Sequence, residues 1–567
     1  MQVSRRDLVK LLAVAAGAGL SPRRLEAADG PARLLAFEPL GNVTLLHITD
    51  AHATLRPVFY REPDTVLGVG AERGRPPFLT GAELLRAYHV APGSVEAYAY
   101  TYLDFPALAA RYGRMGGYAH LATLVKQIRA ERSGRTLLLD GGDTLQGSAT
   151  TLWSRGEDMV RVSNQLGVDV FTPHWEFVYG LERVKELFGD RERRGLFAGD
   201  FVAHNVTVAG WGDHVFHPYT IRDVGGVRVG VIGQAFPYTP VSHPRRFVPD
   251  LTFGIREDGV QILVHELRDD KKVDLVVLLS HNGVAVDLKL AARIHGLDVV
   301  LGGHTHDALP QPVLVGRTLV VNSGAHGKFL SRLDLDVQHG RVGGYRYRLI
   351  PVLAQDVPED PDMAQLIDEI RRPHEAKLSE RLAVSESLLY RRGNFNGTFD
   401  EVILDALLRR GDAQVAFSPG FRWGITIVPG QEITLEDVYS HTAVTYPNTW
   451  VREMTGSEIH QIMEDVADNL FHPDPYYRQG GDMVRLGGLT YAIDPSKRVG
   501  KRIFDIRVAG RPLEPARRYK ATGWASLGEA DGSPAWDVVA DHLRSVRRVK
   551  LDPRARVRLA RTVREGG

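Results

Sequence analysis

The sequence predicts an α/β protein in which a mainly parallel sheet, covered by helices on both faces, is followed by a smaller second α/β domain. Three observations support this fold class. From about residue 42 onward, short runs rich in Leu and Val alternate with stretches of helical periodicity, as in βαβ units. Several of these runs end at glycine, aspartate or histidine. The chain of 567 residues is also long enough for two domains of ordinary size.

The predicted elements follow in chain order. In the first domain we expect helices over 118–132 and 158–166, and strands over 43–48, 136–139, 168–171, 227–232, 275–279, 299–301, 318–321 and 333–337. A polar helix, interrupted at Pro373, forms a linker over 356–384. In the second domain we expect helices over 400–410 and 455–470, and strands over 414–417, 425–428 and 501–508.

Composition excludes several classes of protein. The formal net charge is +1, with 70 Lys and Arg against 69 Asp and Glu, so the chain lacks the charge excess of a nucleic-acid-binding or membrane-surface protein. There is no cysteine, which excludes disulfides, thiolate nucleophiles and zinc–thiolate sites. Any metal ligands must therefore be histidine nitrogens and oxygens.

Residues 1–28 are typical of an export signal. The pair Arg5-Arg6 precedes an apolar run over 11–20 that is too short to span a bilayer, and small residues follow at 27 and 28. The paired arginines favour a twin-arginine signal, which exports folded proteins to the periplasm. An ordinary secretory signal with two adjacent arginines is the alternative. No other stretch is long and apolar enough for a membrane helix, so we expect no membrane span.

An irregular insertion lies between about residues 55 and 113. It contains the aromatic run Tyr98-Ala99-Tyr100-Thr101-Tyr102. Long connections of this kind are usually functional or disordered. The aromatic residues favour an ordered arm that faces the substrate over a floppy loop.

Five short stretches supply aspartate and histidine directly after predicted strands. A buried strand that ends in glycines and then presents two imidazoles packs a core poorly but suits a metal ion. In parallel sheets, ligands bind beyond the carboxyl ends of the strands, where all five stretches fall. The stretches are Asp50-Ala51-His52, Asp140-Gly141-Gly142-Asp143, Pro173-His174-Trp175-Glu176, Ser280-His281-Asn282-Gly283 and Gly302-Gly303-His304-Thr305-His306.

The ligand types indicate the chemistry. Imidazole nitrogen mixed with carboxylate oxygen suits manganese, iron or zinc better than magnesium or calcium. An aspartate that bridges two ions creates a two-metal site, which holds the ions ~3.5–4 Å apart and activates a water molecule near neutral pH. No side-chain nucleophile is then needed. Each stretch alone is weak evidence, but five in order predict a dimetal hydrolase.

The order of these motifs resembles a calcineurin-like metallophosphoesterase domain joined to the C-terminal domain of the 5'-nucleotidase family. The resemblance covers about residues 40–560. It implies a metallophosphoesterase domain over 40–355, a C-terminal domain over 385–562 and a bridging role for Asp143. It also implies that one ion is bound by Asp50, His52, Asp143 and His306, and the other by Asp143, His174, His281 and His304.

One departure from the family pattern bears on function. Where the family has Gly-Asn-His-Glu-x-Asp, this chain has Pro-His-Trp-Glu-Phe-Val over 173–178. The family's asparagine ligand becomes His174, its catalytic histidine becomes Trp175, and the aspartate that orients this histidine becomes Val178. Acid–base help contributes ~10²–10⁴ in rate to a hydrolase. A sulfur leaving group has a much lower pKa than an alkoxide and needs less of this help.

The His-Trp-Glu-Phe stretch, the twin-arginine-like signal and the long insertion resemble the SoxB thiosulfohydrolases of bacterial sulfur oxidation. These are periplasmic dimanganese enzymes that release sulfate from a cysteine-S-thiosulfonate on the SoxYZ carrier. The resemblance implies two manganese ions and a SoxYZ-type partner; the ligand types also admit zinc or iron. It makes Trp175 a substrate-site residue, with a role in core packing as the alternative.

Four residues of the second domain lie where 5'-nucleotidase relatives place substrate-binding groups. The guanidinium of Arg422 suits an oxyanion, and a surface salt bridge is its alternative role. Tyr446 occupies the position of an aromatic residue that stacks on the nucleobase in relatives, and it could instead close a narrow channel. With Trp175 included, the predicted substrate-binding residues are Trp175, Arg392, Asn394, Arg422 and Tyr446.

The leading hypothesis is metal-assisted hydrolysis of a sulfur–sulfur bond. A metal-bound hydroxide attacks the terminal sulfonate sulfur, the ions and Arg422 hold its oxygens, and a persulfide or thiolate departs. The predicted catalytic residues are Asp143, Trp175 and Arg422. One alternative is a periplasmic 5'-nucleotidase or sugar-nucleotide hydrolase, against which Trp175 and Val178 count. The other is a non-enzymatic, metal-containing component of a sulfur-oxidation complex, against which the complete ligand set counts.

Overall fold

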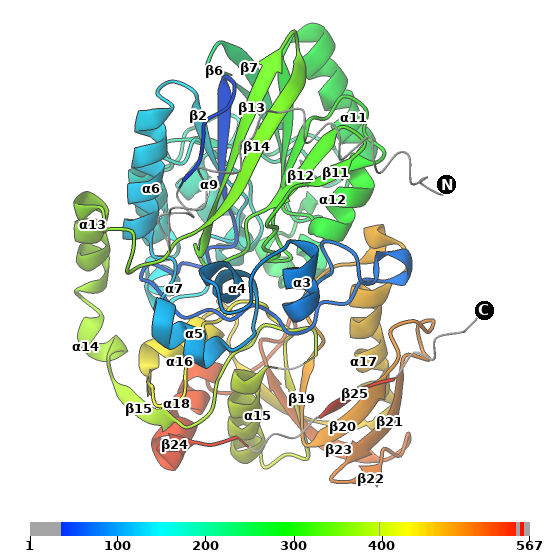
Figure 1. The fold of residues 1–567 in the computed structure, drawn as a ribbon. Coiled ribbons are helices and arrows are strands. Elements are labelled where there is room, and N and C mark those ends of the chain that lie inside the picture. Colours follow the sequence, from blue (N-terminus) through cyan, green and yellow to red (C-terminus); the bar gives the residue numbers. More distant parts are fainter. Residues whose placement is uncertain (1–35, 396, 552–555, 561–567) are drawn as a thin grey trace. The chain divides into compact units, whose positions relative to one another are not determined.

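The computed structural model describes residues 36–395, 397–551 and 556–560. The predicted export signal over 1–28 lies outside the described residues, so its role remains a prediction. Within the described part of the chain, no helix has both the length and the hydrophobicity needed to cross a membrane. From Pro39 onward the chain clusters as one unit, which holds both α/β domains (Figure 1).

Two six-stranded sheets form the centre of the N-terminal domain. The first contains, in spatial order, β14 (Arg341–Pro351), β13 (Phe329–Gln338), β1 (Val43–Ile48), β2 (Thr136–Asp140), β3 (Val170–Phe171) and β4 (Asp200–Phe201). The second contains β11 (Val313–Val315), β12 (Thr318–Asn322), β10 (Val299–Gly302), β9 (Leu275–Ser280), β7 (Val227–Gln234) and β6 (Tyr219–Val224). Each sheet has four parallel strands, from β1 to β4 and from β12 to β7, and its remaining strands pair antiparallel.

The two sheets share an apolar core and are covered by helices on their outer faces. Leu45 and Leu139 of the first sheet belong to one buried cluster with Val231 and Val277 of the second. Figure 1 shows helices on both sides of the strands. The first sheet is covered by α6 (Tyr118–Glu131), α8 (Glu157–Leu166) and α9 (Leu181–Phe188), and the second by α11 (Glu257–His265) and α12 (Val284–Ala291).

The predicted α/β fold class is confirmed, but the expectation of one sheet is wrong. A strand buried between a helix and a second sheet reads as the same continuous apolar run as a strand buried between two helices. The sequence therefore does not distinguish the two arrangements. The shorter elements of this domain are α7 (Ala149–Ser154), η3 (Trp175–Tyr179), β5 (Thr207–Val208), α10 (Thr239–Ser242), η4 (Arg245–Phe247), β8 (Leu251–Thr252) and η5 (Glu266–Asp270).

The insertion over 55–113 is ordered, and it is tied to the sheet by a buried lysine. Lys328 on the turn before β13 donates to Glu62 Oε1 at 2.7 Å and to the carbonyl oxygen of Ala99 at 2.6 Å. Tyr98 and Tyr100 are buried, and their hydroxyls donate to backbone carbonyls. The expectation that these tyrosines face a substrate is therefore wrong. The insertion contains η2 (Gly70–Glu72), α3 (Gly81–Ala87), α4 (Val95–Tyr100) and α5 (Phe105–Tyr112).

The linker and the C-terminal domain follow. Helices α13 (Pro361–Arg371) and α14 (Glu375–Leu378) are separated at Pro373, as predicted. The predicted strand over 425–428 is wrong, because Thr426 and Ile427 form only isolated bridges with Phe59 and Leu389. The helices are α15 (Thr398–Gly411), α16 (Leu435–Thr442), α17 (Gly456–Phe471), η6 (Pro475–Tyr477) and α18 (Ala535–Val546).

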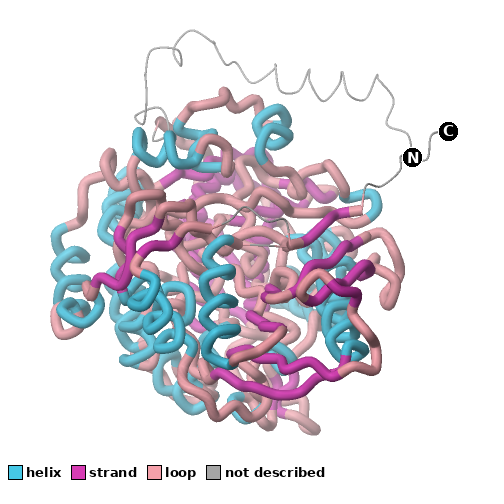
Figure 2. Tube along the Cα trace, turned by 90° about the horizontal axis from the view of Figure 1, so that it is seen from below, coloured by secondary structure: helices cyan, strands magenta, loops and turns pink. Residues whose placement is uncertain are grey.

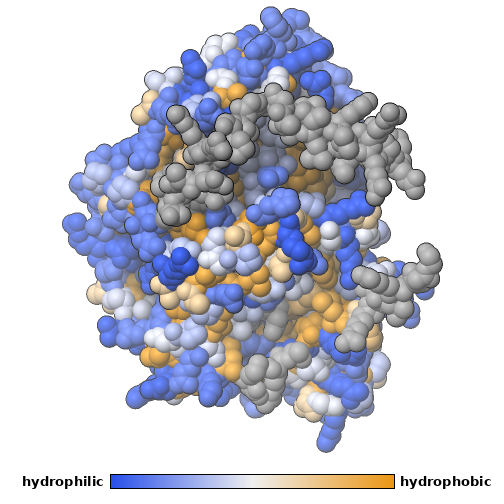
Figure 3. Space-filling model, in the orientation of Figure 1, coloured by the Kyte–Doolittle hydropathy of each residue, from blue (hydrophilic) through white to orange (hydrophobic). Residues whose placement is uncertain are grey.

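Three small sheets complete this domain. The first has four strands, in the order β18 (Thr449–Thr455), β23 (Arg518–Trp524), β16 (Val415–Ser418) and β19 (Arg485–Gly487). The second also has four, in the order β22 (Arg511–Pro512), β21 (Ile503–Val508), β20 (Leu489–Ile493) and β25 (Val557–Leu559). The third contains β17 (Glu432–Thr434), β15 (Arg381–Ser385) and β24 (Arg548–Val549). Loops form much of the trace in Figure 2, and hydrophilic residues dominate the rim of the face in Figure 3.

Candidate metal centre

The five predicted stretches meet where the parallel strands of both sheets end. β1 leads to Asp50 and His52, β2 to Asp143, β3 to His174, β9 to His281, and β10 to His304 and His306. Five of these residues have the left-handed backbone that side-chain-bearing residues rarely adopt. Such strain costs ~1–3 kcal/mol per residue and gathers at functional sites. These residues, with φ between 47° and 73°, are Asp50, His52, Asp143, His304 and His306.

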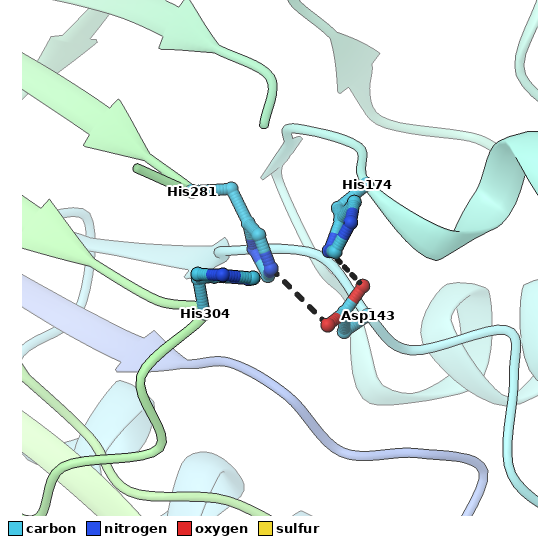
Figure 4. Close-up of side chains that lie close together, drawn as sticks. All are labelled: Asp143, His174, His281 and His304. Atoms are coloured by element: carbon cyan, nitrogen blue, oxygen red, sulfur yellow. Dashed lines mark ion pairs between the residues drawn. The ribbon is translucent and has the colours of Figure 1, made fainter. Parts of the chain in front are cut away.

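The first group of side chains surrounds Asp143 (Figure 4). His174 Nδ1 lies 3.0 Å from Asp143 Oδ1, and His281 Nε2 lies 3.2 Å from Asp143 Oδ2. The His304 ring packs against both histidines, with ring centroids 5.1 Å from His174 and 5.4 Å from His281. One ligand atom from each of the four residues lies within 4.8 Å of the others, so the group could hold a metal ion.

The second group shares Asp143 with the first. His306 Nε2 lies 3.1 Å from Asp50 Oδ1 and 3.1 Å from His52 Nε2, while His52 Nε2 lies 3.9 Å from Asp143 Oδ2. These atoms also lie within 4.8 Å of one another. The two groups have the same members as the two ligand sets that the family resemblance implies. The described residues therefore include the donor set of a two-metal site, although the role of each ligand remains a prediction.

The histidine nitrogens of the site fit a metal ion. His174 Nε2 is buried without a hydrogen-bond partner, and His174 Nδ1 and His281 Nε2 contact only the Asp143 carboxylate, in poor hydrogen-bond geometry. Buried polar atoms in proteins normally have a hydrogen-bond partner. Burial lowers the pKa of His304 and of His306 well below the usual value, so both rings stay neutral and keep a lone pair for a metal.

The buried carboxylates attract positive charge. Burial raises the pKa of Asp50 to about 6, against the opposing effect of His281. Burial would also raise the pKa of Asp143, but the imidazoles of His174 and His281 hold it well below its usual value. Burial lowers the pKa of His281, yet Asp143 and Asp50 outweigh this effect and raise it to about 10. The site thus draws a proton onto His281, where metal ions would supply the positive charge instead.

Glu176 organises the loops that carry Asp143 and His174, and sequence reasoning missed this role. Its fully buried carboxylate accepts hydrogen bonds from the backbone nitrogens of His174 at 2.7 Å, Thr144 at 2.9 Å and Leu145 at 3.2 Å. The backbone nitrogen of Trp175 donates to Asp143 Oδ1 at 2.8 Å. An acidic residue beside an apolar stretch was the only signal available in the sequence.

A cavity of about 220 Å³ opens beside the metal ligands and has an aromatic wall. The Trp175 ring makes edge contacts with Trp423, at a centroid distance of 5.1 Å, and with Phe421, at 5.5 Å. Tyr446 lies nearly parallel to Trp175 at 6.5 Å, and its hydroxyl donates to the carbonyl oxygen of Ser242. The structure therefore brings Trp175, Arg422 and five of the seven predicted metal ligands to one cavity, with Tyr446 behind its wall.

The structure does not bring Arg392 and Asn394 into this cavity. They line a neighbouring cavity of about 70 Å³, on which Arg422 and His304 also border. Asn394 Oδ1 accepts from the backbone nitrogen of Leu67 at 2.9 Å, which ties the insertion to the C-terminal domain. The predicted substrate-binding roles of both residues remain predictions.

The guanidinium groups of two arginines contact the metal-binding turn. Arg422 donates through Nη1 to the carbonyl oxygen of His304 at 3.2 Å, and Arg392 donates through Nη2 to that of Thr305 at 2.7 Å. Asp482, which sequence reasoning missed, lies 3.6 Å from each guanidinium. No local pattern singles out an aspartate that pairs with arginines so far away in the sequence.

Comparison with known proteins supports the same architecture. A model of the calcineurin-like phosphoesterase family matches residues 43–308, and a model of the 5'-nucleotidase C-terminal domain matches residues 383–537. The structure of the sulfate thiohydrolase SoxB from Thermus thermophilus is similar at a TM-score of 0.89 and 39% identity, over 93% of this chain and 98% of that one. The chain belongs to the SoxB family.

More distant relatives are also similar to this chain. A 5'-nucleotidase precursor, also from Thermus thermophilus, is 23% identical, with a TM-score of 0.71, over 92% of this chain and all of that one. The trifunctional nucleotide phosphoesterase YfkN of Bacillus subtilis is 24% identical over 69% of this chain. The chain spans 29% of the length of YfkN. The two family models and the similarity to SoxB show that the chain is a hydrolase of the metallophosphoesterase and 5'-nucleotidase family.

Proposed function

We propose that the protein is a periplasmic dimetal hydrolase that releases sulfate from a cysteine-S-thiosulfonate on a SoxYZ-type carrier. Water adds its oxygen to the terminal sulfonate sulfur, the sulfur–sulfur bond breaks, and the carrier keeps a persulfide anion while sulfate and two protons leave. The similarity to SoxB, at 39% identity over almost the full chain, supports this proposal. We also propose export through a twin-arginine-type signal over 1–28.

The observation that carries the proposal is the aromatic wall at Trp175. In the phosphoesterase pattern, the catalytic histidine occupies this position. Here Trp175, Phe421 and Trp423 pack against one another and offer an apolar surface to the leaving group. A persulfide leaves as a stable anion and does not need a proton donor at that point, whereas an alkoxide does.

Seven residues of the site would bind the metal ions. We propose that Asp143 bridges two ions, with Asp50, His52 and His306 completing one ligand set and His174, His281 and His304 the other. Two bound ions, manganese in preference to zinc or iron, would supply Lewis acidity and lower the pKa of a water molecule toward neutrality. Trp175 would form part of the wall of the substrate channel.

Arg422 would act at the edge of the same cavity. Its Nη1 and Nη2 donate to backbone carbonyls, and its Nε lies 3.6 Å from Asp482 Oδ1. We propose that its positive charge at the cavity wall attracts the sulfonate oxygens. Arg392, Asn394 and Tyr446 would shape the channel around it.

A direct test uses the full-length mature protein, loaded with manganese and supplied with a carrier that bears a cysteine-S-thiosulfonate. We expect sulfate release that stops when a chelator removes the ions. AMP and a sugar nucleotide serve as parallel substrates with phosphate as the readout. Phosphate release without sulfate release would favour a 5'-nucleotidase or sugar-nucleotide hydrolase. No release from any substrate would favour a non-enzymatic metal-containing component.

A further inference from the structure

Two histidines of the metal centre are connected to backbone carbonyls of the C-terminal domain, His304 directly and His52 through the side-chain amide of Gln146. We propose that this domain holds the rings of His52 and His304 in their metal-binding orientation, and that ion binding is therefore linked to the contact between the two domains. The inference rests on the dimetal site of the proposed function but not on its substrate. Gln146, which has no assigned role, carries one of the two connections.

The connection to His52 runs through the side-chain amide of Gln146. The amide nitrogen donates to the carbonyl oxygen of Ala443, in the C-terminal domain, at 2.7 Å. A carbonyl oxygen only accepts, so the amide nitrogen must face Ala443 and the amide oxygen must face His52. His52 Nδ1 lies 3.0 Å from that oxygen. Nδ1 therefore carries the proton, and Nε2 keeps the lone pair.

This tautomer is the one that the second ligand group needs. His52 Nε2 is the atom that lies 3.1 Å from His306 Nε2 and 3.9 Å from Asp143 Oδ2. Gln146 is itself buried, so no exposed donor competes for its amide oxygen. The backbone carbonyl oxygen of Gln146 lies 3.2 Å from the same nitrogen and also only accepts. The carbonyl of Ala443 thus reinforces, through one amide, a tautomer that the N-terminal domain already favours, and it holds the ring in place.

The connection to His304 is direct. His304 Nε2 lies 3.2 Å from the carbonyl oxygen of Gln479, in the C-terminal domain. Because this oxygen only accepts, Nε2 carries the proton and Nδ1 keeps the lone pair. Arg422 and Arg392 donate to the carbonyls of His304 and Thr305, so the same domain also holds the backbone of this turn.

His281 provides the internal comparison. Its Nδ1 lies 2.5 Å from the carbonyl oxygen of Gly141, which belongs to the N-terminal domain. That tautomer does not depend on the C-terminal domain. Each ligand group therefore contains one histidine whose orientation is supported by contact between the domains, directly for His304 and through Gln146 for His52. Since coupling between two equilibria is reciprocal, ions that bind this arrangement must also stabilise the domain contact.

The test removes the Gln146 connection and measures ion affinity. Gln146→Met keeps the length of the side chain but loses both hydrogen bonds of the amide, while the Gln146 backbone carbonyl stays 3.2 Å from His52 Nδ1. Hydrogen-bond partners of metal ligands change metal affinity ~10–100-fold. Titration of the metal-free protein with Mn²⁺ in a calorimeter should show one of two ions bound ~10–100-fold more weakly. Gln431→Met is the matched control, because the Gln431 amide oxygen accepts only from the nearby Val428 backbone nitrogen.

A second variant separates the tautomer from the domain contact. Gln146→Glu keeps an oxygen for His52 Nδ1 but loses the donor to Ala443. We expect Gln146→Glu to bind both ions with at least the affinity that Gln146→Met keeps for its more tightly bound ion. Unchanged affinity for both ions in a folded Gln146→Met protein would overturn the proposed role of Gln146.

Hydrogen exchange of the unmodified protein tests the linkage itself. Mn²⁺ should slow exchange in peptides covering residues 440–446 and 476–484, and leave β21 unaffected. In Gln146→Glu, the slowing over 440–446 should be lost. Equal exchange with and without Mn²⁺ in both segments would overturn the linkage. A chain that binds no Mn²⁺ would overturn the dimetal site as well, whereas a chain that binds ions without releasing sulfate would refute only the proposed substrate.

Discussion

Replacing Gly480 by alanine tests the contact between the C-terminal domain and His304. A Cβ atom at this position would lie 2.2 Å from His304 Nε2 and 2.8 Å from His304 Cδ2. Non-bonded heavy atoms pack at about 3.5–4.0 Å, so the ring or the loop must shift by roughly 1 Å. The φ of 77° at Gly480 adds a left-handed strain of ~1–2 kcal/mol for alanine.

We expect the ion held by His304 to bind ~10–100-fold more weakly in Gly480→Ala, because the imidazole can no longer occupy its place beside Asp143. Sulfate release should fall with ion occupancy and recover in part at high Mn²⁺. Calorimetric titration of the metal-free variant gives the affinity, and initial rates at increasing Mn²⁺ give the recovery.

Gly500→Ala is the control for backbone strain. Gly500 has a similar φ of 82°, but a Cβ atom there would meet nothing within 4 Å. This variant should lose stability to a similar extent through strain and still bind both ions at wild-type affinity. If Gly480→Ala binds both ions as tightly as Gly500→Ala does, the argument from the contact with His304 is wrong.

Three further predictions follow from buried charge. Asp143→Ala should abolish sulfate release and lower the bound metal, measured by elemental analysis; unchanged metal content and turnover would contradict the bridging assignment. Lys328→Met should destabilise the fold by ~3–5 kcal/mol in urea unfolding, because it leaves the Glu62 carboxylate buried and unpaired, and adding Glu62→Gln should recover most of this loss. Burial lowers the pKa of His441 well below its usual value, so only the unfolded state gains its proton below pH ~6.5. The free energy of unfolding should therefore fall from pH 7 to pH 5, and in His441→Phe it should fall by about 2 kcal/mol less. His295→Gln, at an exposed position, is the control. Equal losses in the unmodified protein and both variants would refute the assignment.

Much of the metal centre could be predicted from the sequence because its ligands break the pattern of their surroundings. His304 and His306 follow a fully apolar strand, where a polar side chain needs a functional reason. Asp143 and His281 stand in the same position after other strands. The predicted strands and helices of the N-terminal domain also match the observed ones to within a few residues, with β13 the most extended beyond its prediction.

What could not be predicted depends on contacts between distant residues. Gly480 contacts His304 across the domain interface, and nothing in its local sequence indicates this contact. Gln146 looks like a polar loop residue until Ala443 is placed beside its amide. The prediction that the tyrosines of the insertion face a substrate was wrong, also because of a distant contact. Tyr100 lies in a segment that has an irregular sequence, yet its hydroxyl donates to the carbonyl oxygen of Leu349 in the core.

The central claim is tested most directly by hydrolysis in ¹⁸O-labelled water with mass spectrometry of both products. The manganese-loaded protein should transfer one labelled oxygen to each sulfate released and leave a persulfide on the carrier cysteine. On the same preparation, phosphate release from AMP should be far slower. A carrier that keeps its sulfonate while AMP is hydrolysed rapidly would contradict the proposed sulfur–sulfur hydrolysis.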